Sequence, residues 1–285
     1  MSEKEILPVG VLVRINDDPF KVFAKVRDAG LSYCQMVSPP DEYMYGKGAE
    51  SMTLRIKEAL KENGITVNSV FMSFKNQIWT YPHDAMRTIG LVPPETRAER
   101  IVRACRIGNW ARDMGVDVLA AHVGFIPEDR DCELYKKFIE AMRELALFLE
   151  CNDQYFTFET GQESVEVLKN TIEDIGTANL GINFDPANLL LYDMDEPSYL
   201  VEKLGKYVMH VHCKDGVRPE KKGILGTETP LGEGKSGFEN LLRKLYSLGY
   251  RGPLTIEREI TGAQQDADII KAKSLIEKIK KELIK

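Results

Sequence analysis

Four short segments in the second half of the sequence share one alternating pattern, which constrains the fold more than any other feature. In each segment apolar side chains occupy every second position, and the intervening positions are largely polar and end in a carboxylate or an imidazole. Side chains of a β-strand point alternately to opposite faces, so each segment is predicted to be a strand with one packed face and one polar face. The segments are 155–159, 181–185, 208–212 and 253–257, which end in Glu159, Asp185, His212 and Glu257.

The spacing of these segments predicts parallel strands joined by helices. Intervals of 26 and 27 residues separate Glu159, Asp185 and His212, and each suffices for one strand–helix–strand unit. The 45-residue interval to Glu257 allows the same unit with an enlarged loop. The first half of the chain alternates similarly, with strands expected at 9–14, 31–37, 67–73 and 116–123. Helices are expected at 19–29, 51–63, 97–114, 131–151, 164–175, 197–204, 237–248 and 266–284.

Eight strands and eight helices in strict alternation predict an α/β fold, a (β/α)8 TIM barrel formed by one domain over residues 1–285. A doubly wound open sheet is the alternative, but no strand reads as an exposed edge. A long loop is expected between the third strand and Pro94, passing through Trp79 and Tyr81. Ser164 and Asp266 are the expected N-caps of their helices.

The carboxyl ends of barrel strands meet at one end of the barrel, where three carboxylates and one imidazole would surround a divalent metal ion. The ligand hardness favours Mn²⁺, with Mg²⁺ and Co²⁺ close to it, whereas Zn²⁺ prefers more histidine or thiolate. The formal ligand charge leaves the site slightly anionic, which suits a neutral sugar or polyol that offers two oxygens.

Polar side chains one step deeper on the same faces are expected to support the ligands through hydrogen bonds. These are Thr157, Asn183, His210 and Thr255.

Candidates for substrate contact lie around the expected site, and each has an ordinary alternative. His122 could be a structural histidine, and Glu163 a charge at a helix start. Trp79 could anchor its loop, and Lys214 could point to solvent. Cys213 alternates away from the site and is expected to be packed.

The composition limits the kinds of partner and the cellular location that we expect for this protein. A net charge of −6 disfavours binding to a nucleic-acid backbone. No apolar run approaches the ~18–20 residues of a membrane span, and the N-terminus lacks the features of a signal peptide. Five scattered cysteines without a Cys-x-x-Cys pair indicate reduced thiols and a cytoplasmic location. An apolar stripe on the C-terminal helix leaves a homo-oligomer open, although packing on its own barrel is favoured.

Several motifs resemble the sugar phosphate isomerase/epimerase group of the xylose-isomerase-like barrel superfamily. The matching stretches are 90–94, 121–127, 158–163, 183–188, 210–215, 230–234 and 254–259. The resemblance implies that Glu159, Asp185, His212 and Glu257 are the metal ligands. It also implies that Glu159 and Glu257 are catalytic residues that handle protons.

The chain departs from similar ketose 3-epimerases at two positions that the resemblance assigns to substrate binding. Those enzymes have a histidine three residues after the strand-six aspartate, where this chain has Asn188. They have an arginine after the strand-seven histidine, which Arg218 matches approximately. The identity of the substrate stays open.

The hypothesis from the sequence is a metal-dependent isomerase or epimerase of carbohydrate metabolism. It would act on a sugar, keto-sugar or sugar phosphate by proton transfer through a metal-stabilised enediolate. Dehydration of an inosose-like polyol ketone is the main alternative. A non-catalytic sugar-binding barrel is a further one. A phosphodiesterase that resembles apurinic endonucleases is disfavoured, because it would need more than the four histidines present.

Overall fold

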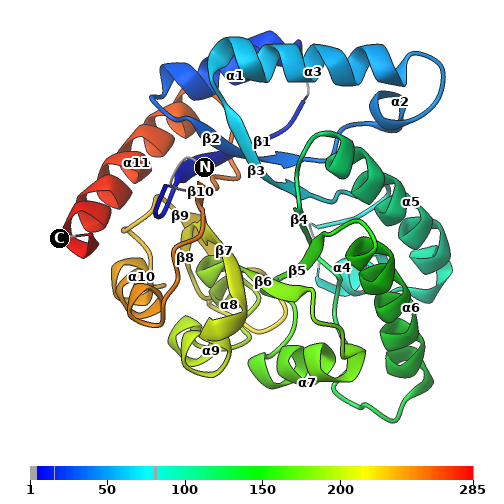
Figure 1. Ribbon diagram of the computed structural model, residues 1–285. Helices are drawn as coiled ribbons and strands as arrows, with labels where there is room; N and C mark the ends of the chain where they lie inside the picture. Colours follow the sequence, from blue (N-terminus) through cyan, green and yellow to red (C-terminus); the bar gives the residue numbers. More distant parts are fainter. Residues whose placement is uncertain (1–4, 16, 80–81, 285) are drawn as a thin grey trace.

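The computed structural model describes residues 5–15, 17–79 and 82–284. Within these residues eight parallel strands close into a barrel in the order β1-β10-β7-β6-β5-β4-β3-β2, surrounded by helices (Figure 1). The strands are β1 (Val9–Val13), β2 (Tyr33–Val37), β3 (Thr66–Phe71), β4 (Val118–Ala121), β5 (Tyr155–Glu159), β6 (Leu180–Phe184), β7 (Val208–Cys213) and β10 (Leu254–Ile256). The predicted (β/α)8 barrel is therefore confirmed.

The helices that cover the barrel follow its strands, as their apolar periodicity predicts. They are α1 (Pro19–Asp28), α3 (Ala49–Asn63), α5 (Pro94–Asp113), α6 (Glu133–Glu150), α7 (Val165–Ile175), α9 (Pro197–Leu204), α10 (Phe238–Ser247) and α11 (Ala263–Leu283). Ser164 is the N-cap of α7, where its hydroxyl accepts a hydrogen bond from the Val167 amide at 3.3 Å. Asp266 is not an N-cap, because α11 begins at Ala263 and places Asp266 in its first turn.

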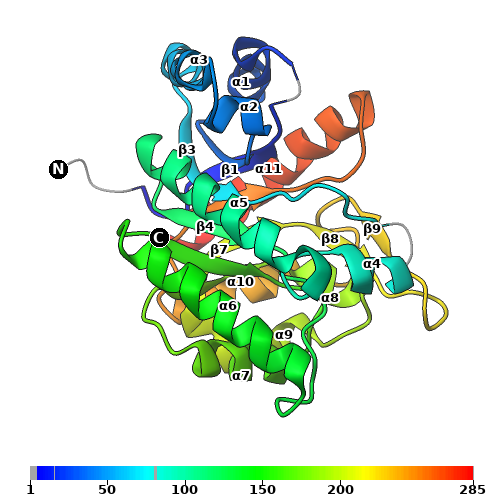
Figure 2. The same ribbon diagram turned by 90° about the vertical axis from the view of Figure 1, so that its right-hand side faces the viewer.

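Strict alternation of strands and helices needs one correction, because short elements interrupt it. They are α2 (Asp41–Met44), α4 (Pro82–Thr88), α8 (Pro186–Leu191), the 3₁₀ helix η1 (Gly205–Tyr207) and the antiparallel hairpin of β8 (Asp215–Val217) and β9 (Thr227–Thr229). The region expected to be one long loop thus contains α4; Tyr81 lies outside the described residues. Figure 2 shows α4, β8 and β9 at the same end of the barrel.

Successive side chains of each strand point alternately to the helices and to the barrel interior, as predicted. Phe156, Phe158, Ile182 and Phe184 are buried against the helices. The intervening side chains point into the barrel, where Thr157 and Asn183 are fully buried polar groups. The barrel thereby brings polar groups from separate strands into contact. Among the residues that the structure describes, no helix combines the length and apolar character that a membrane span requires.

Candidate metal centre

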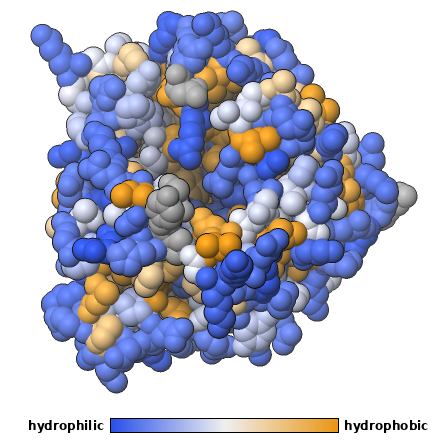
Figure 3. Space-filling view, turned by 180° about the vertical axis from the view of Figure 1, so that it is seen from behind, coloured by the Kyte–Doolittle hydropathy of each residue, from blue (hydrophilic) through white to orange (hydrophobic). Residues whose placement is uncertain are grey.

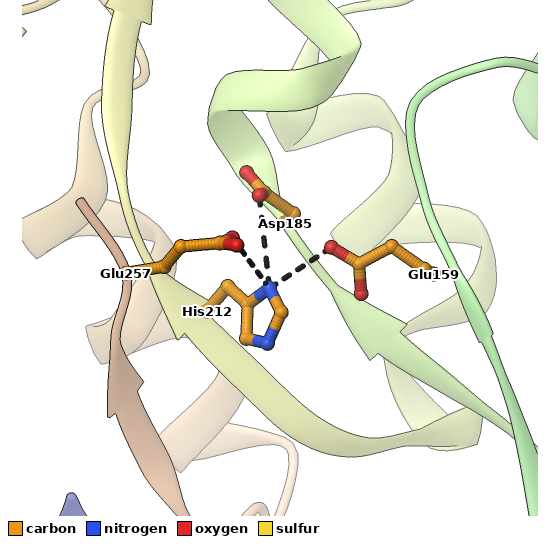
Figure 4. Close-up of side chains that lie close together, drawn as sticks. All are labelled: Glu159, Asp185, His212 and Glu257. Atoms are coloured by element: carbon orange, nitrogen blue, oxygen red, sulfur yellow. Dashed lines mark ion pairs between the residues drawn. The ribbon is translucent and has the colours of Figure 1, made fainter. Parts of the chain in front are cut away.

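Four strand ends bring the predicted ligands together. Glu159 ends β5, Asp185 directly follows β6, His212 lies near the end of β7, and Glu257 directly follows β10. One ligand atom of each lies within 4.8 Å of those of the other three. Figure 4 shows Glu159 and Glu257 on opposite sides of the His212 ring, with Asp185 between them. His212 Nδ1 lies 2.9 Å from Glu159 Oε1, 3.0 Å from Glu257 Oε2 and 3.7 Å from Asp185 Oδ2.

His212 is held in one orientation from the opposite side of the barrel. Its Nε2 atom lies 2.5 Å from Oε1 of Gln35, which comes from β2. The Gln35 amide nitrogen donates to Ser69 Oγ at 2.8 Å and Asn183 Oδ1 at 3.2 Å, so Oε1 is left to accept from Nε2–H. The ring also stacks on Phe71, with centroids 6.0 Å apart. Nδ1 therefore faces the carboxylates with its lone pair available to a cation.

Asp185 is fixed by its backbone as well as by its side chain. It is the N-cap of α8, and its Oδ1 accepts from the Asn188 amide at 3.0 Å. The Thr160 hydroxyl accepts from the Asp185 amide at 2.8 Å. These bonds occupy Oδ1 and leave Oδ2 directed towards His212.

Glu159 is surrounded by amide donors. Asn183 Nδ2 donates to Oε2, and Asn188 Nδ2 lies 3.3 Å from Oε1. Burial raises the pKa of Glu159 to about 7, although the nearby His212 acts in the opposite direction. Asn188 thus contacts a predicted ligand.

Lys214 is buried in the cluster. The alternative that it points to solvent is therefore wrong. Its Nζ lies 3.4 Å from Glu257 Oε2, 3.6 Å from Asp185 Oδ2 and 3.1 Å from Glu259 Oε2. Burial acts to raise the pKa of Glu257, but Lys214 and His212 outweigh it and hold that pKa below its usual value. With three carboxylates and this ammonium, the inner cluster has a formal charge of −2, which one divalent cation would neutralise.

The deeper polar layer is connected differently from the prediction. Asn183 contacts a predicted ligand directly, but His210 bonds to Ser69 Oγ at 3.1 Å and Thr255 Oγ1 at 2.6 Å. Thr157 donates to the Leu119 carbonyl instead of to a ligand. The sequence interpretation missed Gln35 and Ser69. Their signal was a polar side chain in the middle of each of two short strands, and both side chains are fully buried in the structure.

The donor set fits a divalent cation. Asp185 Oδ2 is buried and accepts no hydrogen bond among the described residues, and His212 Nδ1 is buried and faces only carboxylate oxygens. Burial alone would lower the pKa of His212, but Glu159 and Glu257 raise it well above its usual value. A positive charge at the position that Nδ1 faces would therefore stabilise the cluster, and either a proton or a metal ion can supply it. Carboxylate oxygens and one imidazole suit Mn²⁺, Mg²⁺ or Co²⁺.

The remaining candidates lie at or beside the carboxyl end of the barrel. Figure 3 views this face, which is hollowed near its centre. The Trp79 ring lies 5.0 Å from the ring of His122, and burial lowers the pKa of His122 to about 3, so this imidazole is neutral. Glu163 is buried beyond β5. Arg218 pairs through its guanidinium with Asp193 at 2.9 Å and Glu196 at 2.8 Å on the α8–α9 loop, so its predicted contact with substrate stays a prediction.

The structure is a (β/α)8 barrel whose carboxyl end holds a cluster that could bind a divalent metal ion, at the end where barrel enzymes have their active sites. The family model described as xylose isomerase-like TIM barrel matches residues 23–278. The chain belongs to this family.

A solved structure, a xylose isomerase domain protein from Planctomyces limnophilus, is 32% identical to this chain. The alignment covers 98% of this chain and 99% of that one, with a TM-score of 0.92. An uncharacterized protein from Methanocaldococcus jannaschii is 28% identical over 181 residues. That match covers 56% of this chain and 57% of the relative, so the chain spans little more than half of the relative's length.

Two solved structures of lower identity share the fold. One is a xylose isomerase-like TIM barrel protein from Mycobacterium smegmatis in complex with magnesium, 16% identical with a TM-score of 0.74 over 99% of this chain and 98% of that one. The other is a D-tagatose 3-epimerase-like protein, 19% identical with a TM-score of 0.71 over 97% and 98% of the two chains.

Proposed function

We propose that this protein is a divalent-metal-dependent sugar isomerase or epimerase that transfers a proton at the carbon next to a carbonyl group. One observation carries the proposal. The carboxylates of Glu159 and Glu257 approach a common centre from opposite sides, at 2.9 and 3.0 Å from His212 Nδ1 (Figure 4). Two carboxylates placed in this way can reach both faces of a substrate carbon.

The cluster of Glu159, Asp185, His212 and Glu257 would hold the cation, with Mn²⁺ as the first candidate and Mg²⁺ and Co²⁺ next. When bound, a divalent cation supplies Lewis acidity that polarises a substrate carbonyl oxygen. The neighbour solved with magnesium supports a cation on this fold.

The two glutamates differ in charge environment, which suggests a division of the proton transfer. Lys214 keeps Glu257 ionised, so its carboxylate is suited to remove the proton from carbon. Glu159 faces the same centre from the other side and is suited to return a proton. Return to the opposite face of the same carbon gives an epimer, and return to the neighbouring carbon gives an aldose–ketose isomer. Water then restores both protonation states.

The test combines Mn²⁺-loaded protein, D₂O and NMR, with ketoses, inososes and their phosphates as substrates. We expect deuterium at the carbon next to the carbonyl in at least one sugar, together with an isomer or epimer of unchanged carbon skeleton. Glu159→Gln and Glu257→Gln should each reduce turnover at least 10³-fold, roughly the contribution of one acid or base. Glu144→Gln, an exposed carboxylate of α6, is the control and should retain normal turnover.

Other outcomes contradict the proposal. A product that has lost one water would assign dehydration instead. Sugar binding with no exchange of carbon-bound hydrogen for any member of the panel would indicate a binding protein.

A further inference from the structure

Glu163 is a buried carboxyl group outside the cluster of the four predicted ligands. It is 4% exposed, and neither of its carboxylate oxygens has a hydrogen-bond partner in the described part of the chain. Burial raises its pKa to about 8. An unpaired buried carboxyl group destabilises the folded protein whether it is ionised or neutral. A ligand that forms a hydrogen bond with this group would offset that cost.

A cavity of about 880 Å³ opens beside this side chain. Its walls come from α4, the start of α5, the β4–α6 loop and the β5–α7 loop, all of which lie at the carboxyl end of the barrel. Next to Glu163, Gln162 also lines the cavity and has an unpartnered Oε1. None of the four predicted metal ligands is among the lining residues. The cavity is therefore additional space at the same end of the barrel as the four predicted ligands.

The lining indicates the chemistry of the ligand. Apolar walls formed by Val92, Phe125, Ile126 and Met194 suit the carbon-bound hydrogens of a sugar ring. The titratable side chains of the lining are four carboxyl groups and one guanidinium, namely Asp84, Glu95, Glu128, Glu163 and Arg87. This excess of carboxyl groups disfavours phosphate and carboxylate ligands. Hydroxyl groups, in contrast, can donate to the free oxygens of Glu163 and Gln162.

We infer that this cavity is a subsite for a second, uncharged sugar unit, joined to the unit that reacts at the metal centre and bound through Glu163. The inference rests on the proposed function for the identity of the first unit. It specifies the substrate as a non-phosphorylated glycoside or disaccharide. The cavity volume of about 880 Å³ agrees, because it lies near the upper end of the roughly 300–1,000 Å³ found for pockets that enclose drug-sized ligands.

The experiment measures binding by calorimetry to the full-length protein loaded with Mn²⁺. The probes are four keto-disaccharides (turanose, palatinose, maltulose and lactulose), fructose, glucose and fructose 6-phosphate. We expect at least one disaccharide to bind at least tenfold more tightly than fructose and glucose, and fructose 6-phosphate to bind no more tightly than fructose.

Two independent variants address the cavity. Glu163→Leu removes the hydrogen-bonding oxygens, and Leu134→Trp fills the cavity from a partly exposed lining position. Each should abolish the advantage of the disaccharide, whereas Glu144→Gln on the outer surface of α6 should keep it. Thermal unfolding verifies that each variant is folded.

The inference is overturned if no disaccharide binds more tightly than its components, or if the advantage survives in both cavity variants. Its failure is distinguishable from failure of the proposed function. Hydrogen exchange on monosaccharides without a gain from the second unit would remove the subsite alone. Tight disaccharide binding without any hydrogen exchange would remove the proposed function and leave the subsite.

Discussion

Lys214 shows how one side chain sets the charge of the whole cluster. Its side chain is 2% exposed, and its ammonium group lies between Glu257, Asp185 and Glu259. Burial would lower the pKa of Lys214, but these carboxylates raise it well above its usual value, so the side chain stays charged. The lysine therefore compensates one of the ligand charges permanently, and a bound divalent cation would compensate the other two.

Replacement of this lysine should lower the free energy of unfolding more in the metal-free protein than in the metal-loaded protein. Lys214→Met leaves the buried carboxylates without their ammonium, and loss of one partner from a buried pair costs ~3–5 kcal/mol. Mn²⁺ then meets a more anionic site and should restore more stability than it adds to the unchanged protein. Urea unfolding in chelator and in Mn²⁺ measures both differences. The exposed Lys235→Met is the control, and an equal loss with and without metal would contradict this account.

Glu163 should make stability depend on pH with a definite sign. Burial raises the pKa of Glu163 from its ordinary value of 4.5 to about 8. Between these values the unfolded chain releases a proton that the folded protein retains, so the folded state loses stability as pH rises through this window. Glu163→Gln removes the effect. The metal-free variant should match the unchanged protein near pH 4.5 and exceed it at pH 9 by a few kcal/mol, at about 1.4 kcal/mol per pKa unit. Urea unfolding at both values is the measurement, and equal stability at pH 9 would disprove it.

At the scale of elements, the loop between β7 and α10 is built around Asp215. Its Oδ1 accepts from the amides of Gly216 and Ser236 at 2.9 and 3.0 Å, and its Oδ2 from those of Gly232 and Gly234 at 3.0 and 3.1 Å. A Cβ at Gly234 would lie 2.2 Å from Asp215 Oδ1, so a side chain does not fit there. The amides of the glycine-rich turn are thus occupied by the Asp215 carboxylate.

Asp215→Asn should loosen this turn. One acceptor oxygen becomes an NH₂ group that faces backbone N–H donors, and each buried group left unpaired costs ~1–3 kcal/mol. Hydrogen exchange at the Gly232 and Gly234 amides should accelerate by roughly 10- to 100-fold on that basis. Glu233→Gln, an exposed change in the same turn, should leave it unaltered. Unchanged exchange in Asp215→Asn would mean that the turn is held by other contacts.

The sequence predicts those parts of the fold whose pattern repeats. The four strand ends share one alternation, so the convergence of Glu159, Asp185, His212 and Glu257 follows from strand geometry. Elements shorter than about two helical turns, such as α4 and α8, give no readable periodicity. The burial of Lys214 was not predictable, because it depends on how a long loop folds back. Arg218 was selected by approximate spacing, and spacing does not fix the direction of a side chain in a loop.

At the scale of the whole molecule, the candidate metal centre joins one half of the barrel to the other. Its four ligands belong to β5, β6, β7 and β10, which are consecutive in the barrel wall. Gln35 on β2 reaches across the interior to His212 and Asn183. A cation would therefore link the ends of four neighbouring strands, and Gln35 connects that set to the opposite wall.

This arrangement predicts that Gln35 controls metal affinity from across the barrel. Gln35→Leu leaves His212 Nε2–H without its acceptor, so the ring can turn and Nδ1 loses its alignment. Loss of such an outer partner lowers metal affinity roughly 10- to 100-fold. Gln35→Glu keeps an acceptor for Nε2–H and should recover most of the affinity.

Calorimetric titration with Mn²⁺ measures the affinity of each variant, and unfolding with and without metal gives a second readout. Metal at 100 times its Kd stabilises the folded state by about 2.7 kcal/mol, and at the same concentration Gln35→Leu should gain less. A structural role alone would lower the stability of both variants in chelator and leave their Mn²⁺ affinities equal. That result would show that the two halves of the barrel are coupled through packing and not through the orientation of His212.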